Sequence, residues 1–104
     1  MKLLFVCNQN ENRSKTAENL FTEFETKSAG LFNDKPVTED QLRWADIIVV
    51  MEEKHRTEIA KRFPNTYLMK RIISLEIPDI YHYNQPKLVE ILKAKFNESI
   101  SEIV

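Results

Sequence analysis

The chain has 104 residues, which is enough for one domain with a modest core and too short for a second domain. Its 15 basic and 16 acidic residues give a net charge of -1, which argues against a general nucleic-acid binder. The single cysteine cannot form a disulfide within the chain, and no apolar run is long enough for a membrane span or a signal core. We therefore expect a cytoplasmic protein with one domain over residues 1–104.

The amino-terminal stretch predicts a strand, a tight loop and a helix. A short apolar strand over 3–6 ends at Cys7, and a polar run over 8–12 follows it. A helix is predicted over 14–24, where apolar residues recur at helical spacing: Ala17, Leu20, Phe21 and Phe24. Free backbone N–H groups at the start of such a helix attract anions, so the loop is a candidate phosphate-binding site.

Cys7 and Arg13 enclose this loop, with five residues between them. One turn of backbone can then surround a phosphate, while the planar guanidinium of Arg13 binds two of its oxygens. The same positive surroundings favour the nucleophilic thiolate form of Cys7, and Ser14 can donate a hydrogen bond to it. The loop residues predicted to bind the phosphate are Asn8, Gln9, Asn10, Glu11, Asn12 and Arg13. A lone cysteine at a strand end is also commonly a small buried hydrophobic residue, so the spacing alone leaves both interpretations open.

The next segment predicts a second strand and a capped helix. The strand, over 27–29, ends at Gly30, which is the only glycine and is expected in a turn that needs an unusual φ angle. After a loop over 31–37, Thr38 and the Gln three residues later form a capping box that opens a short helix through Trp44.

The central segment predicts a buried strand and a further helix. The continuous apolar run over 47–51 is typical of a strand buried on both faces. A helix over 52–63 follows and is ended by Pro64. We interpret His55 on this helix as a surface or capping group, because no second His, Cys or Asp stands at a metal-like spacing from it.

The last part of the chain predicts a fourth strand over 66–69, a segment over 72–75 that leads to a loop with Asp79, and a helix from Pro86 to the C-terminus. Strands that alternate with helices favour an α/β fold: a three-layer domain with a parallel sheet and helices on both faces. The ligand site of such a sheet lies at the carboxyl ends of its strands, where Cys7 falls.

The loop motif resembles the active-site loop of the low-molecular-weight protein tyrosine phosphatases, V-C-x-G-N-x-C-R-S followed by A-E. The matching residues are Val6-Cys7, Asn10, Arg13-Ser14 and Ala17-Glu18. Three further segments follow in the family's order: Ser28-Ala29-Gly30 is similar to its SAG element, 45–51 to its third strand and 77–81 to its late D-P-Y loop. The resemblance covers nearly the whole chain and implies a four-stranded sheet in the order 2-1-3-4.

This chain departs from the family's pattern at several positions. Gln9 replaces a glycine, Asn12 replaces a second cysteine, and Ile80 replaces the proline after the late Asp. The chain is also short between Gly30 and Ala45, where the family builds part of its substrate wall.

The resemblance implies a cysteine-dependent phosphatase that works through a cysteinyl-phosphate intermediate, without a metal or cofactor. Asp79 would be the general acid and then the base. Tyr81 and Tyr83 could form an aromatic wall for a phosphotyrosine ring, or they could equally be packing residues. Ser28 would hydrogen-bond Asn10 and support the loop. The implied substrate is a phosphorylated protein or a small phosphomonoester.

Alternatives stay open at the sequence level. An arsenate reductase resembles this loop, but the type that shuttles a disulfide needs more cysteines than Cys7. A cysteine phosphocarrier would normally lack the arginine. The changes at Gln9, Glu11 and Asn12 suggest instead a phosphate- or phosphoprotein-binding module without turnover. Glu11 at the rim would also disfavour acidic peptides and favour a basic or small substrate.

Overall fold

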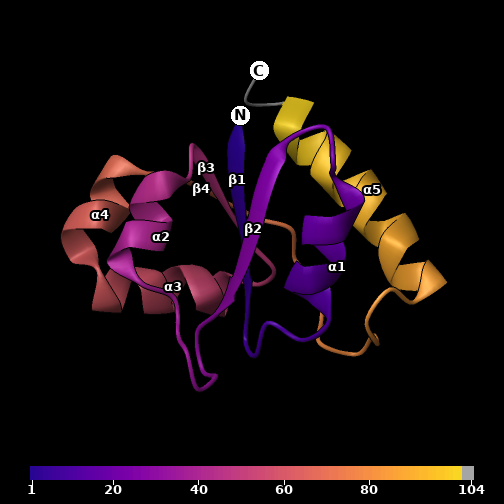
Figure 1. Cartoon of the computed structure of the whole chain (residues 1–104), viewed down its shortest axis with the longest axis horizontal. Coiled ribbons are helices and arrows are strands. Elements are labelled where there is room, and N and C mark those ends of the chain that lie inside the picture. The colour runs from indigo at the N-terminus through magenta and orange to yellow at the C-terminus, as the bar shows by residue number, and fades with distance from the viewer. Residues whose placement is uncertain (102–104) are drawn as a thin grey trace.

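Four parallel strands form the central sheet, and helices cover both of its faces (Figure 1). The computed structural model describes residues 1–101. The strands are β1 (Lys2–Cys7), β2 (Glu25–Gly30), β3 (Ile47–Val50) and β4 (Arg71–Ser74). They pair in the order β2-β1-β3-β4, which confirms the predicted fold and strand order. Cys7 ends β1, inside the sheet and at its carboxyl edge.

Two hydrophobic cores lie on opposite faces of the sheet. Because side chains alternate along a strand, Leu3 and Phe5 of β1 face one core, while Leu4 and Val6 face the other. The first core lies under α1 (Arg13–Leu20) and α5 (Pro86–Ser101). The second lies under α2 (Glu39–Trp44), α3 (Glu53–Arg62) and α4 (Pro64–Met69). Within residues 1–101, no helix is both long enough and apolar enough to span a membrane.

Several local predictions are confirmed. The capping box of α2 is complete, since the Gln41 N–H donates to Thr38 Oγ1 at 3.2 Å and the Thr38 N–H donates to Gln41 Oε1 at 2.9 Å. Helix α3 begins and ends within one residue of its prediction, and α5 begins at Pro86. Residues 102–104 of the predicted last helix lie outside the described residues.

The predicted fourth strand over 66–69 is wrong, because this segment belongs to helix α4. Pro64 is the first residue of α4, where the missing N–H has no partner to lose, so the proline that ends one helix also opens the next. Leu68 and Met69 are 82% and 83% exposed, so this apolar pair did not mark a buried strand. Residues predicted only to lead into the Asp79 loop form β4 instead.

Helix α1 is shorter than predicted. Helix α1 ends at Leu20 rather than near Phe24, because Phe21 leaves the helical region with φ -95° and ψ 60°. The rings of Phe21 and Phe24 still pack on Phe96, so packing rather than a longer helix accounts for their spacing.

Gly30 has no positive φ, which makes the predicted unusual turn wrong. Its small size has a different reason: a Cβ at this position would lie 2.9 Å from the Asn8 carbonyl oxygen and 2.8 Å from Asn33 Nδ2. Glycine therefore allows β2 to pass close beside the loop that follows Cys7.

Candidate active site

The sulfur of Cys7 lies beneath the loop and contacts the first turn of α1. Cys7 Sγ is 2.9 Å from Ser14 Oγ, and the Asn10 N–H donates to the sulfur at 3.3 Å. Ser14 donates its single proton to Asn10 Oδ1 at 2.6 Å, so a protonated Cys7 donates to Ser14. When Cys7 is a thiolate, the Ser14 hydroxyl has to turn its proton toward the sulfur. The predicted pair of Cys7 and Ser14 is thus brought together.

The loop closes through a left-handed residue at Asn10, which has φ 57°. Asparagine tolerates this conformation better than most residues, because its short polar side chain bonds locally. Gln9 is not among the residues with positive φ, so this position does not require a glycine. Among residues 1–101, the backbone N–H groups of Glu11, Asn12 and Arg13 have no hydrogen-bond acceptor, which leaves them for an anion.

Arg13 is almost fully buried, with 1% of its surface exposed, and is held from one side. Its Nη1 donates to Glu52 Oε2 at 2.6 Å and to the Ile77 carbonyl at 2.7 Å. Within the described part of the chain, its Nε is buried without any hydrogen-bond partner. A buried charged donor without a partner is costly, so Nε is suited to a ligand oxygen. The guanidinium is therefore anchored by one edge while Nε stays available.

Two carboxylates flank this guanidinium. Asp79 Oδ1 lies 3.7 Å from Arg13 Nε, and Asp79 is half exposed. Burial raises the pKa of Glu52, but the hydrogen bond and charge of Arg13, helped by Lys54, outweigh burial and lower its pKa overall. Glu52 therefore stays ionised at neutral pH and holds Arg13 in place.

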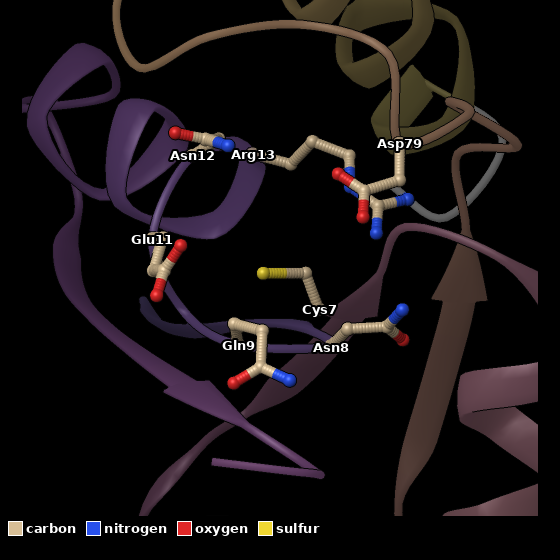
Figure 2. Close-up of a pocket in the computed structure, with 7 residues that line it drawn as sticks. All are labelled: Cys7, Asn8, Gln9, Glu11, Asn12, Arg13 and Asp79. Atoms are coloured by element: carbon tan, nitrogen blue, oxygen red, sulfur yellow. The ribbon is translucent and has the colours of Figure 1, made fainter.

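A small pocket lies between the loop that follows Cys7 and the segment that carries Asp79, as Figure 2 shows. Its lining joins most of the predicted site: Cys7, Asn8, Gln9, Glu11, Asn12, Arg13 and Asp79. Asp79 comes from a segment more than 60 residues away in sequence and lies over the Arg13 guanidinium. Glu11 stands at the opposite rim. In residues 1–101, no group of three or more His, Cys, Asp or Glu side chains is arranged to hold a metal ion.

Two predicted residues do not take their expected places. Ser28 donates to Glu18 Oε1 at 2.9 Å, so the predicted bond to Asn10 is wrong, and Asn10 is held by Ser14 instead. Tyr81 is half-buried against the hydrophobic core and does not line the pocket.

Sequence reasoning missed the roles of Glu52 and His55. Glu52 anchors Arg13. His55 does cap the start of α3, as one of its two predicted alternatives stated, because its Nδ1 accepts from the Glu52 N–H at 3.0 Å. It is buried beside the loop rather than exposed, and its contact with Asn8 was not predicted. A signal for both exists in the sequence, since they follow β3. The carboxyl ends of neighbouring parallel strands meet at one edge, so polar residues after β3 are expected near the loop after β1.

The sequence matches no protein-family model and no curated protein. Solved structures do resemble it. The low-molecular-weight protein tyrosine phosphatase from T. tengcongensis superposes with a TM-score of 0.76 at 21% identity, covering 98% of this chain and 99% of that chain. The tyrosine phosphatase AmsI from Erwinia amylovora gives 0.78 at 21% identity, with 97% and 91% covered. This chain has the low-molecular-weight tyrosine phosphatase fold.

The same fold is found in the YwlE arginine phosphatase from Geobacillus stearothermophilus, with a TM-score of 0.65 at 22% identity and 93% and 84% of the two chains covered.

In this chain, the phosphatase fold is formed with a single cysteine, which ends β1. The fold also tolerates the short connection between Gly30 and Ala45, because residues 31–33 bond directly to the loop. The Leu31 and Phe32 N–H groups donate to the Asn8 carbonyl at 3.0 and 2.9 Å.

Proposed function

We propose that the chain is a cysteine-dependent phosphatase that hydrolyses phosphomonoesters, with phosphotyrosine as its substrate class. The observation that carries this proposal is that Arg13 lines one pocket with Cys7, while its buried Nε has no hydrogen-bond partner in residues 1–101 and lies only within ion-pair distance of Asp79 Oδ1, at 3.7 Å. A phosphate oxygen would give that donor its acceptor, and the loop N–H groups would take the others. The phosphatase fold supports the same conclusion.

The reaction would proceed by two displacements at phosphorus. The Cys7 thiolate attacks, a sulfur–phosphorus bond forms, and the bond to the leaving oxygen breaks as Asp79 gives that oxygen its proton. Water then attacks the cysteinyl-phosphate and gives a proton to Asp79, and the sulfur–phosphorus bond breaks. The products are inorganic phosphate and the thiolate, so Asp79 returns to its starting state.

Steady-state hydrolysis of p-nitrophenyl phosphate tests this proposal directly. We expect turnover by the purified chain and competitive inhibition by inorganic phosphate, because both ligands would occupy the same loop. Phosphate binding without turnover would contradict the enzyme and favour a non-catalytic phosphate-binding module.

Asp79→Asn is expected to lower kcat by roughly 10²-fold for phenyl phosphate, and by much less for p-nitrophenyl phosphate. The reason is that p-nitrophenolate leaves readily without a proton, whereas phenolate needs one. The kcat values of the two substrates measure the difference. Asp40→Asn, an exposed change in α2, is the matched control and should leave both values unchanged. Equal losses on both substrates would mean that Asp79 does not protonate the leaving group.

Phosphoarginine is a second candidate substrate, favoured by the charges around the pocket. Three carboxylates, Glu11, Glu52 and Asp79, stand against two cations, Arg13 and Lys54. The local balance is therefore -1, which disfavours a lone phosphate dianion and suits a phosphate attached to a guanidinium. The arginine phosphatase among the structures of the same fold supports this candidate.

Glu11→Gln separates the two candidates. Loss of the rim charge should raise kcat/KM for an acidic phosphotyrosine peptide by about fivefold, since an exposed charge contact contributes at most about 1 kcal/mol. If phosphoarginine is the substrate, the kcat/KM of Glu11→Gln for phosphoarginine should fall below the wild-type value instead. Glu25→Gln, at the start of β2 and the other edge of the sheet, is the control. A change of the same sign and size on both substrates would show that the rim charge does not select the substrate.

A further inference from the structure

His55 is buried in the first turn of α3, with no exposed surface, and both of its ring nitrogens are bonded. Nδ1 accepts a hydrogen bond from the Glu52 N–H at 3.0 Å. Nε2 lies 2.7 Å from Asn8 Oδ1. Since Nδ1 has to accept, the proton of the neutral ring is on Nε2, and the ring donates to Asn8.

Each partner of His55 belongs to the phosphate pocket. Asn8 follows Cys7 directly and lines the pocket. Glu52, whose N–H is fixed by the ring, binds Arg13 Nη1 through its carboxylate at 2.6 Å. A continuous path of hydrogen bonds therefore runs from Asn8 through His55 and Glu52 to Arg13. Its contacts join residues 47 and 39 positions apart in sequence.

We propose that His55 is a positioning residue of the phosphate site: as the neutral ring protonated on Nε2, it fixes the loop after Cys7 relative to the Arg13 guanidinium. This inference rests on the proposed function, because it takes the loop to be a phosphate-binding site. The ring itself touches neither the sulfur nor the pocket, so it acts through Asn8 and Glu52.

The charges that face the ring are consistent with a neutral imidazole. Burial, followed by the positive charge of Arg13, lowers the pKa of His55 from 6.5 to about 4. Lys54 acts in the same direction, while Glu52 and Asp79 oppose it. Protonation would place a hydrogen on Nδ1, facing the Glu52 N–H, so two donors would meet. The contact is therefore kept at neutral pH and lost in acid.

Two substitutions separate the two bonds of the ring. In His55→Asn, the amide oxygen can replace Nδ1 and keep the bond from Glu52, but the side chain is too short to reach Asn8. In His55→Gln, the amide nitrogen can reach Asn8 and donate to it, and the amide oxygen can accept from the Glu52 N–H as Gln41 does from Thr38 in α2, so both bonds can be kept. His82→Asn changes the only other histidine, which is exposed in the late loop, and serves as the matched control.

The probe is inorganic phosphate, titrated into each folded variant and followed by NMR. We expect His55→Asn to weaken phosphate binding by about five- to tenfold and to raise KM for p-nitrophenyl phosphate more than it lowers kcat. The phosphate affinity of His55→Gln should stay within about twofold of the wild-type value, and the affinity of His82→Asn should equal the wild-type value. The double variant His55→Asn with Asn8→Ala should lose no more phosphate affinity than the weaker-binding single variant, because both substitutions remove the same hydrogen bond. Equal losses in the Asn and Gln variants, or additive effects in the double variant, would overturn the proposal.

Two further measurements follow the ring itself, and the first, made on the wild type alone, is independent of how the variants fold. The ¹⁵N chemical shifts of the two His55 ring nitrogens should show a neutral ring protonated on Nε2 from pH 7 to about pH 5. A ring protonated on Nδ1 in this range would overturn the proposal. As pH falls from 6.5 toward 4, the unfolded chain takes up a proton that folded His55 does not bind. Wild-type stability should therefore decrease in that window, more than in His55→Asn.

The two proposals fail in different ways. A wild type that binds phosphate and shows the expected ring, yet turns nothing over, contradicts the phosphatase and leaves the positioning role intact. A wild type that binds no phosphate overturns both.

Discussion

Cys7→Ser is expected to lower kcat for p-nitrophenyl phosphate by roughly 10⁴-fold or more. A serine hydroxyl stays protonated at neutral pH and needs a nearby general base to act as a nucleophile. The contacts of this position offer none, since Ser14 Oγ and the Asn10 N–H are its hydrogen-bond partners in residues 1–101 and both nitrogens of His55 are occupied elsewhere. Steady-state kinetics of the purified variant measure the loss.

The control for Cys7→Ser is the affinity for inorganic phosphate. Serine is slightly smaller than cysteine and can bond both Ser14 and the Asn10 N–H, so the loop should stay closed and phosphate should still bind. A variant that keeps more than about a tenth of the wild-type kcat would contradict a covalent cysteinyl-phosphate. In that case water would attack the phosphate directly, and the buried cysteine would be a packing residue.

Much of the fold could be predicted because its signals are local. The uninterrupted apolar runs before Cys7 and over 47–51 predict buried strands, and both runs are buried in the structure. The capping box at Thr38 fixes the start of α2 through contacts only three residues apart. Helix α4 was missed because its apolar residues Leu68 and Met69 face outward, so their pattern carries no information about burial.

The pocket was predictable only in part, for a related reason. Residues within the loop are fixed by short-range geometry, so the closeness of Cys7 and Ser14 follows from strand, loop and helix alone. The bonds from Arg13 to Glu52 and from His55 to Asn8 depend on the order of the strands, which places the end of β3 beside the end of β1. The resemblance implies that order, but no local pattern in the sequence pairs Glu52 with Arg13 or His55 with Asn8.

Arg13→Lys is expected to lower kcat/KM for p-nitrophenyl phosphate by roughly 10²- to 10³-fold, the size found when one donor to a developing oxyanion is removed. Lysine keeps the positive charge beside Glu52 and so avoids leaving that carboxylate unpaired. It cannot serve Glu52, the Ile77 carbonyl and a phosphate at once, because an ammonium is a compact point charge rather than a planar fork. Phosphate affinity should fall together with the rate.

Arg56→Lys is the matched control, because Arg56 makes the same kinds of contact outside the pocket. It pairs with Glu53, Nε to Oε2 at 3.1 Å, and donates to the Ile72 carbonyl at 2.9 Å. A lysine there should leave kcat/KM within about twofold of the wild type. If Arg13→Lys behaved like this control, Arg13 would serve only to join Glu52 to the Ile77 carbonyl. Nε, which has no hydrogen-bond partner in residues 1–101, would then be no phosphate donor, and the pocket would have to bind its anion through backbone N–H groups alone.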